Sequence, residues 1–179
     1  MLNKNLVVTG GLGFIGKNYI NSVKDIYEKI IVIDKGSPYS DYGYFESIKQ
    51  KNINLFEINI RELSSLKTEL PKSFDLINFA AESHVDRSFK NSINFSESNY
   101  IDTHHALEFL RTSSHDYRIL HISTDEVYGS SDSIAINESH PMSPTNPYSV
   151  SKAAADLLMQ AYMVCYKMPI LIVRPNNIY

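Results

Sequence analysis

The sequence predicts an α/β fold, a doubly wound parallel sheet with helices on both faces. Short apolar runs alternate with segments of helical periodicity along the 179 residues, and the first apolar run leads straight into a glycine-rich turn. Repeated strand–helix alternation gives parallel strands joined by right-handed crossovers, which place helices on both sides of one sheet. The length suits one domain with one core.

Six apolar runs are expected to form the strands: residues 6–9, 29–33, 53–58, 74–80, 118–123 and 170–173. Helices are expected after the glycine turn, around Leu63, Leu66 and Leu70, and over residues 95–111 and 148–166. Pro147 stands at the first position of the last helix, where its missing N–H has no intrahelical partner to lose. Residues 35–43 and 129–146 are expected to be long loops.

The glycine turn follows the first strand and has the spacing Gly10, Gly13, Gly16. Such spacing lets the chain turn tightly, bring its backbone against a pyrophosphate and pack the new helix on the sheet. Asp34 ends the second strand, 18 residues beyond Gly16, and suits a carboxylate that accepts a hydrogen bond from a ribose hydroxyl. A carboxylate there repels a 2′-phosphate, so the pattern predicts a Rossmann-like domain that binds NAD. An ordinary structural turn is the alternative.

Acid–base groups gather in two later segments. Tyr148 and Lys152 are four residues apart on one helical face, and an ammonium group beside a phenol favours the phenolate, so Tyr148 could act as a base near neutral pH. Asp125 and Glu126 are adjacent and follow Thr124, and like charges resist joint ionisation. Consecutive strand residues point to opposite faces, so both carboxyl groups must lie past the strand end. The alternatives are a solvated helix pair and loop carboxylates that cap a turn.

Composition and charge exclude several classes of function. The net charge of −3 predicts no nucleic-acid partner, and no apolar run approaches the roughly 20 residues that span a bilayer. The start of the chain has no signal-peptide pattern, so a cytoplasmic protein is expected. Cys165, the only cysteine, allows no internal disulfide and is expected to be buried in the last helix, and the six histidines have no metal-ligand spacing.

The chain resembles the nucleotide-sugar 4,6-dehydratases of the extended short-chain dehydrogenase/reductases, which act on dTDP-glucose or UDP-glucose. The residues that carry the resemblance are 9–16, 34–35, 78–88, 121–129, 146–153 and 174–179. The string Thr-Asp-Glu-Val-Tyr-Gly at 124–129 discriminates best, because related epimerases and decarboxylases lack its Asp-Glu pair. The resemblance therefore implies an NAD-dependent hydro-lyase that converts a nucleotide-diphosphate glucose to the 4-keto-6-deoxy sugar, as in rhamnose-type synthesis.

The same resemblance implies a role for each catalytic group. Tyr148 would take the proton of the sugar 4-hydroxyl, Thr124 would hydrogen-bond the same oxygen, and Lys152 would hold the nicotinamide ribose and lower the pKa of the tyrosine. Glu126 would remove the C5 proton while a protonated Asp125 donates to the departing 6-hydroxyl.

Binding residues follow by the same resemblance. Those implied for the cofactor are Gly10, Gly13, Phe14, Ile15, Gly16, Asp34, Lys35, Asn59, Ile60, Ala80, Ala81, Ser83, Asn99, Tyr148 and Lys152, and those implied for the substrate are Ser83, His84, Thr124 and Asn177. No metal is expected. For His84 the alternative is a structural loop histidine, and for Asn99 a polar group that ties its helix to the sheet.

The sequence departs from the family pattern in three places. Ile58-Asn59-Ile60 stands where the family usually has Gly-Asp-Ile, so the adenine amino group would meet an amide oxygen, and Asp102 replaces a helix glycine with no predictable effect. The loop after Asp34 also differs. The family is much longer, so we expect residues 1–179 to be the NAD-binding, catalytic domain without the C-terminal substrate domain, either as a fragment or as a naturally short chain, and NAD binding to survive better than turnover.

Other readings stay open. The chain could be a nucleotide-sugar 4-epimerase, or a truncated module that binds NAD without turnover. The Asp-Glu string fits dTDP-glucose enzymes, whereas residues 174–179 are nearer to UDP-glucose enzymes of rhamnose synthesis. A homodimer joined through the long helices is expected by family analogy alone.

Overall fold

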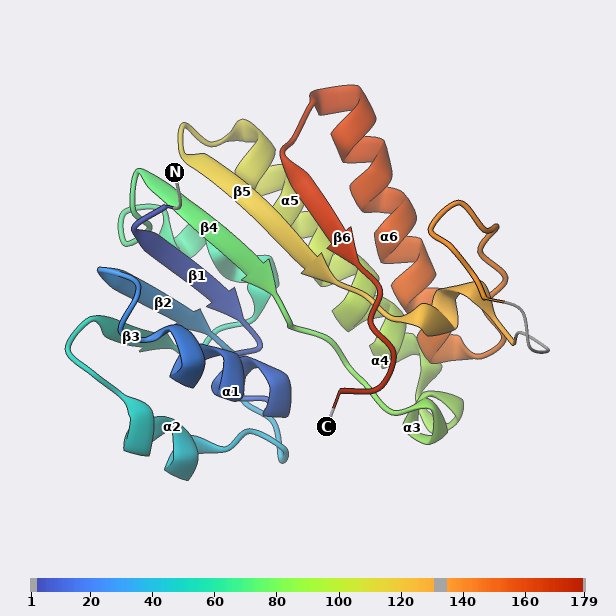
Figure 1. Ribbon diagram of the computed structural model, residues 1–179, viewed down its shortest axis with the longest axis horizontal. Coiled ribbons are helices and arrows are strands. Elements are labelled where there is room, and N and C mark those ends of the chain that lie inside the picture. The colour runs from blue at the N-terminus through green and yellow to red at the C-terminus, as the bar shows by residue number, and fades with distance from the viewer. Residues whose placement is uncertain (1–2, 131–134, 179) are drawn as a thin grey trace.

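The computed structural model describes residues 3–130 and 135–178, and its centre is a six-stranded parallel sheet in the order β3-β2-β1-β4-β5-β6 (Figure 1). The strand order reverses between β1 and β4, because the chain runs from the centre to one edge and then crosses back. The predicted doubly wound α/β fold is confirmed. The strands are β1 Asn5–Thr9, β2 Lys29–Ile33, β3 Ile53–Phe56, β4 Ser73–Asn78, β5 Asp116–Ile122 and β6 Ile170–Val173.

The helical segments include two α-helices that the sequence pattern did not predict, α2 and α3. The segment around Leu63 and Leu66 is a 3₁₀ helix rather than an α-helix, and the segment predicted at 95–111 contains a π-helical turn. The segments are α1 Phe14–Val23, α2 Tyr42–Ile48, η1 Ile60–Leu66, α3 Val85–Lys90, α4 Ser92–Ser96, η2 Glu97–Ile101, α5 Asp102–Thr112, η3 Asp125–Tyr128 and α6 Pro147–Tyr166.

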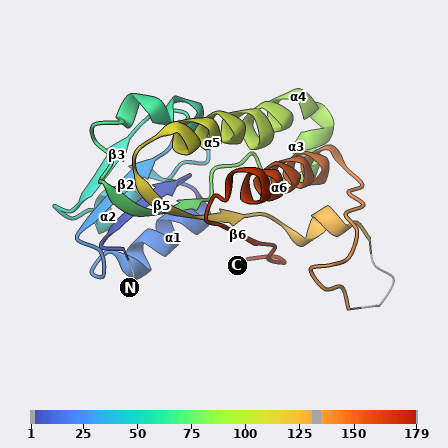
Figure 2. The same cartoon turned by 90° about the horizontal axis from the view of Figure 1, so that it is seen from above.

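Alternate residues of each central strand pack into two separate hydrophobic cores. Leu6 and Val8 of β1 pack with Ile20 of α1 and Phe45 of α2, whereas Val7 faces the core built by η1, α5 and α6. Figure 2 shows α5 and α6 on one side of the sheet and α1 on the other. Helices therefore cover both faces, and the carboxyl ends of the strands are left to form a site.

The long helix α6 begins as the sequence predicts. The Asn146 side chain accepts a hydrogen bond from the Ser149 backbone N–H at 2.8 Å, and Pro147 occupies the first turn. The expectation of a buried Cys165 is wrong: the thiol is exposed, because the buried stripe of α6 ends at Tyr162 and the last turn extends past it.

Residues 3–130 and 135–178 form neither a membrane-spanning helix nor a metal-binding cluster. No helix in this part of the chain is long and apolar enough to cross a membrane. The same residues contain no group of three or more His, Cys, Asp or Glu side chains that could hold a metal ion.

Candidate active site

Two adjoining cavities of about 330 and 600 Å³ lie at the carboxyl ends of the strands and share the wall formed by Gly10, Gly13 and Phe14. The smaller, which we call the Asp34 cavity, extends over the ends of β2 and β3 to Asn59. The larger, the Tyr148 cavity, extends over β5 and α6 to the segment after β6. Together they are lined by every residue predicted for the site except Asn99.

The glycine turn is built for close approach of backbone to backbone. Gly10 has φ +68°, and a Cβ atom there would lie 2.7 Å from the Ala80 nitrogen, so the turn requires glycine on both counts. A Cβ atom at Gly16 would lie 2.3 Å from the Gly10 carbonyl oxygen. A Cβ atom at Gly13 would meet only that oxygen, at 3.3 Å, and Gly13 lines both cavities. This cradle fits a pyrophosphate at the start of α1.

Asp34 lies at the end of β2 and also braces the glycine turn. One carboxylate oxygen accepts from the Leu12 backbone N–H at 2.9 Å, and the other accepts from the Gly36 backbone N–H at 3.0 Å. A carboxylate has about four lone-pair directions, so acceptor capacity is left for ribose hydroxyls. The neighbouring Lys35 donates to the Ser98 hydroxyl at 3.0 Å and also lines the Asp34 cavity.

Asn99 lines neither cavity. The side chain is buried, and both of its N–H groups are used: one donates to the Glu82 carbonyl oxygen at 3.0 Å and one to the Ser151 hydroxyl at 2.8 Å. Its oxygen accepts from the Glu82 backbone N–H at 2.7 Å. The structure thus supports the alternative reading, in which Asn99 ties the π-helical turn to the loop after β4 and to α6.

Tyr148 and Lys152 both line the Tyr148 cavity, but the expected effect of the lysine on the tyrosine is wrong for this structure. Burial raises the pKa of Tyr148, against a lowering by its hydrogen bond with Thr124, and the carboxylates of Glu126 and Asp125 raise it further. Burial lowers the pKa of Lys152 to about 8, and its ammonium donates to the Ile122 carbonyl oxygen at 2.7 Å. Burial disfavours the Tyr148 phenolate and the Lys152 ammonium alike. This effect outweighs the closeness of the two side chains on one helical face.

The carboxyl pair lies past the end of β5, as predicted. Thr124 is the N-cap of η3, and its hydroxyl oxygen accepts from the Glu126 backbone N–H at 3.3 Å. Asn146 donates from its side-chain amide to a Glu126 carboxylate oxygen at 3.0 Å, which orients that group in the cavity wall. This second role of Asn146, besides capping α6, was not predicted from the sequence. Asp125 and Glu126 thereby face the same cavity as Thr124 and Tyr148.

A buried polar chain underlies the catalytic residues. Thr9 donates to the Asn78 side-chain oxygen at 2.6 Å, and the amide nitrogen of Asn78 lies 3.1 Å from His121 Nδ1. Burial, followed by the nearby Lys152 charge, lowers the pKa of His121, so the imidazole is neutral and Nδ1 accepts from Asn78. Its other ring nitrogen faces Asp156 at 3.7 Å. This chain crosses from β1 to α6 directly behind Lys152.

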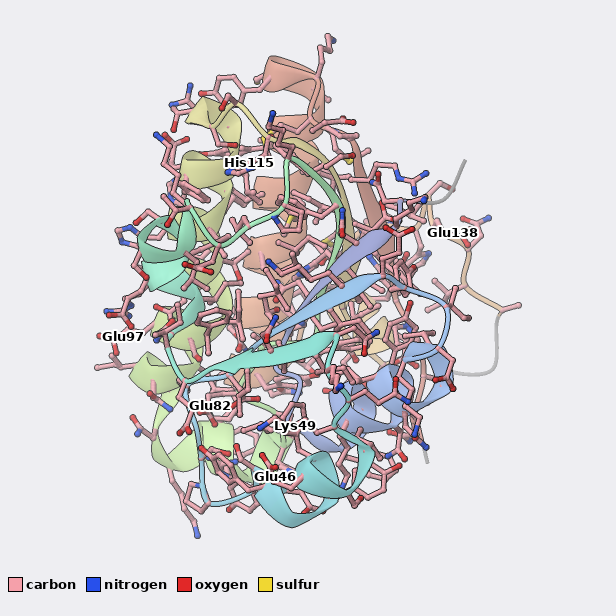
Figure 3. All side chains as sticks on the ribbon, turned by 90° about the vertical axis from the view of Figure 1, so that its left-hand side faces the viewer. Glu46, Lys49, Glu82, Glu97, His115 and Glu138 are labelled. Carbon is pink, nitrogen blue, oxygen red and sulfur yellow. The ribbon has the colours of Figure 1, made fainter. Side chains whose placement is uncertain are left out.

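A brace in the wall of the Asp34 cavity was not predicted from the sequence. Glu82, which follows β4, pairs with Arg87 at 2.8 Å and with Lys35 at 3.4 Å, and the Arg87 guanidinium stacks over the Tyr39 ring. Figure 3 shows Glu82 in the lower half of the molecule, well separated from His115, which precedes β5 near the top. Arg87 belongs to the segment 78–88 that carries the family resemblance, but no functional role was assigned to it. No sequence pattern pairs it with Tyr39. The brace joins the loops after β2 and β4.

The residues implied for substrate all line the Tyr148 cavity, and all of them except Thr124 are exposed. Ser83, His84 and Asn177 are exposed, and His84 has φ +76°, a conformation that is rare outside glycine. Strained backbone of this kind clusters at binding and catalytic sites. The cavity thus combines a hydroxyl, a phenol, two carboxyl groups and an amine with exposed polar side chains, which suits acid–base chemistry on a polyhydroxylated ligand.

Comparison with known proteins agrees with this geometry. A family model described as GDP-mannose 4,6 dehydratase matches residues 7–179. A dTDP-D-glucose 4,6-dehydratase of Dictyostelium discoideum is 38% identical over an alignment of 195 positions that covers 98% of this chain and 44% of that protein. A trifunctional UDP-glucose 4,6-dehydratase/UDP-4-keto-6-deoxy-D-glucose 3,5-epimerase/UDP-4-keto-L-rhamnose-reductase of Arabidopsis thaliana is 36% identical, over 98% of this chain and 28% of that protein.

Solved structures give the same result. The crystal structure of DesIV, a dTDP-glucose 4,6-dehydratase of Streptomyces venezuelae with NAD and TYD bound, superposes with a TM-score of 0.88 at 34% identity, and covers 95% of this chain and 55% of that one. The chain thus spans about half the length of these relatives, or less. With a family model matched over nearly all of its residues, this chain belongs to the GDP-mannose 4,6-dehydratase family.

Proposed function

We propose that this chain is the NAD-binding, catalytic domain of a nucleotide-sugar 4,6-dehydratase, a hydro-lyase. The observation that carries the proposal is the position of Asp125 and Glu126 in the wall of the cavity that also holds Thr124 and Tyr148. Oxidation of a sugar hydroxyl needs only the tyrosine and threonine. Two further carboxyl groups at the same cavity supply the acid and the base for loss of water.

The residues present fit a dinucleotide. Gly10 and Gly16 leave no room for side chains at the turn, Gly13 opens onto both cavities, and Asp34 keeps acceptor capacity at the end of β2. The related DesIV structure contains NAD. NAD, when bound, supplies the hydride acceptor for the sugar C4 position, the hydride donor for C6, and a cationic ring that favours the Tyr148 phenolate.

Tyr148 and Thr124 handle the first half of the reaction. Tyr148 accepts the proton of the 4-hydroxyl as that carbon loses hydride and becomes a ketone, and Thr124 hydrogen-bonds the same oxygen. The pKa of Tyr148 is raised by burial, so the residue needs neighbouring positive charge to act as a base near neutral pH. Lys152, one helical turn on, lies in the same cavity and would hold the nicotinamide ribose.

Asp125 and Glu126 handle the second half. The 4-ketone acidifies the C5 hydrogen, which Glu126 removes as a proton while Asp125 donates a proton to the 6-hydroxyl. The C6–O bond breaks and water leaves. Reduction at C6 and return of a proton to C5 complete the 4-keto-6-deoxy sugar, so the net change is the loss of one water. Asn146 holds the Glu126 carboxylate in place for this step.

The substrate class follows from the relatives named above, which act on dTDP-glucose or on UDP-glucose. We infer a nucleotide-diphosphate glucose and a product for deoxysugar synthesis of the rhamnose type. The exposed Ser83, His84 and Asn177 would contact the sugar nucleotide. Most contacts to its nucleotide part would come from a further C-terminal domain, so NAD binding by residues 1–179 should exceed turnover.

We also infer that the protein forms a homodimer through α6. Val150, Leu157 and Val164 recur every seven residues on α6 and are 50%, 57% and 67% exposed, which suits a helix-to-helix contact between two copies. We propose that this homodimer lies in the cytoplasm, a reducing compartment in which an exposed thiol such as Cys165 would stay unoxidised.

Two alternatives predict different products. A 4-epimerase would return the 4-epimer of the substrate, and a module without turnover would bind NAD and release no product. The test is to incubate the chain with NAD and with dTDP-glucose or UDP-glucose, and to assay for a 4-keto-6-deoxy sugar by its absorbance in alkali. A 4-epimer would contradict dehydration, and intact substrate with NAD bound would favour the module.

A further inference from the structure

We propose that Asp102 is a positioning residue for adenine recognition: it fixes the side-chain amide of Asn59 so that the amide oxygen is offered to the adenine amino group. This inference rests on the proposed NAD-binding function. It concerns a residue that replaces a glycine of the family pattern and that had no predictable effect from the sequence.

The arrangement of the two cavities determines which of them would bind the adenine. The glycine turn lies in the wall that the two cavities share, so the pyrophosphate sits between them. The reacting half of the dinucleotide must lie beside Tyr148. The other half therefore lies in the Asp34 cavity, where Asp34 takes the ribose and the base reaches the far wall, formed by Asn59, Ile60 and Asp102.

The orientation of the Asn59 amide is determined by partners that can act in one way only. Its nitrogen donates to the Asp102 carboxylate at 2.8 Å, and a carboxylate only accepts. Its oxygen accepts from the Arg61 backbone N–H at 3.0 Å, and a backbone N–H only donates. Turning the amide over would break both hydrogen bonds. The oxygen keeps a second lone pair, and Asn59 lines the cavity.

Asp102 is itself held rigidly. Its side chain is 3% exposed, and its other carboxylate oxygen accepts from Arg61 Nε at 2.7 Å. It is the first residue of α5 and follows the π-helical turn that carries Asn99. The carboxylate is therefore fixed by an ion pair on one side and by Asn59 on the other. Arg61 cannot rotate away without leaving a buried charge unpaired, and Asn59 cannot do so without leaving a carboxylate oxygen without its donor.

The two departures from the family pattern, Asn59 and Asp102, are therefore coupled. A carboxylate at position 59 would stand beside the Asp102 carboxylate, where the nitrogen now lies at 2.8 Å, and like charges at that distance repel. An aspartate at 59 therefore requires position 102 to be uncharged. Either combination presents an oxygen acceptor to the base, and the acceptor matches the exocyclic amino group of adenine but not the keto group of hypoxanthine.

The test compares two ligands that differ only at that position, NAD and nicotinamide hypoxanthine dinucleotide, by calorimetric titration of the 179-residue chain. We expect wild type to bind NAD about 3- to 10-fold more tightly, the worth of one hydrogen bond. Asp102→Ala removes one of the two hydrogen bonds that orient the amide and should lower the ratio. Asn59→Asp alone should weaken both ligands, and Asn59→Asp with Asp102→Gly should restore the wild-type ratio.

Asp102→Asn serves if Asp102→Ala fails to fold, and it should also lower the preference for NAD. Arg61 only donates, so its side chain takes the new amide oxygen and leaves an N–H₂ group facing the Asn59 nitrogen. The Asn59 amide then loses its hydrogen bond to position 102 or, by turning over, its hydrogen bond from the Arg61 backbone N–H. Glu97→Ala is the matched control, an exposed carboxylate on the preceding helical turn that points outward in Figure 3. Its ratio should equal that of wild type.

The outcomes separate this inference from the proposed function. A wild-type chain that binds neither ligand overturns NAD binding and this inference with it. A wild-type chain that binds both equally, or an unchanged ratio in the folded Asp102 variants, overturns the role of Asp102 and leaves NAD binding intact.

Discussion

Arg174 donates from Nε to Asp156 Oδ2 at 2.7 Å and so fastens the end of β6 to α6, one helical turn beyond Lys152. The same guanidinium donates from Nη1 to the Tyr128 hydroxyl oxygen at 2.6 Å, in the 3₁₀ helix that carries Asp125. One side chain therefore joins the two catalytic segments to the strand that precedes Asn177.

We predict that Arg174→Met lowers the free energy of unfolding by about 3–5 kcal/mol, because it leaves the Asp156 carboxylate buried without its cation. Burial already raises the pKa of Asp156, and losing Arg174 raises it further, so the loss should shrink as the pH falls toward that pKa. Urea unfolding at several pH values measures both. The double variant Arg174→Met, Asp156→Asn should lose less than the single variant; equal losses would show that the pair does not couple.

Lys152→Met should stabilise the fold near neutral pH. The folded-state pKa of Lys152 is about 8 against 10.5 for a free lysine, so burying the charge opposes folding most below pH 8. As the pH rises from about 8 to 10.5 the folded protein releases the proton first, and that penalty of up to about 3 kcal/mol disappears. The gain from Lys152→Met should shrink over the same pH range in urea unfolding. A gain that stays constant with pH would contradict this account.

Gly10→Ala should destabilise the chain and abolish cofactor binding. The position has φ +68°, and the added methyl group would lie 2.7 Å from the Ala80 nitrogen, so we expect a loss of about 1–3 kcal/mol or more. Gly43→Ala is the matched control in α2, where the methyl group meets only an Asp41 oxygen at 3.8 Å. It should be neutral or gain about 0.5–1 kcal/mol. Thermal melts and NAD titration compare the two.

Tyr148→Phe should separate binding from chemistry. The variant keeps the ring but loses the hydroxyl that takes the proton of the sugar, so turnover should fall by about 10²–10⁴-fold. The Asp34 cavity is untouched, and NAD affinity should stay within about threefold of wild type. Turnover is measured by steady-state assay and NAD affinity by calorimetry, on the same preparation. A variant with wild-type turnover would exclude Tyr148 from the mechanism.

Strand positions and the glycine turn were predictable because they depend on local patterns. The apolar runs at 29–33 and 170–173 match β2 and β6 to the residue, and the capped start of α6 lies where Asn146 and Pro147 predict it. The same reasoning missed α2 and α3, since each has six or seven residues and too few turns to show a helical period.

The residues of the candidate site could be predicted from the sequence, but their burial, their pKa shifts and their tertiary contacts could not. Periodicity places Tyr148 and Lys152 on one face, yet it cannot show that burial moves both pKa values against the charged forms. Nor can it show that the π-helical turn brings Asp102 against Asn59, which are 43 residues apart. Such pairings arise from tertiary contacts between segments that share no sequence pattern.

The central claim, dehydration by Glu126 and its neighbours, is tested most directly by turnover in D₂O with NAD and the preferred sugar nucleotide, followed by mass spectrometry and NMR of the product. We predict a 4-keto-6-deoxy sugar with one solvent deuterium at C5, because Glu126 removes that hydrogen as a proton, and no such product from Glu126→Gln. A 4-epimer without deuterium at C5, or a product formed equally well by Glu126→Gln, would contradict the account.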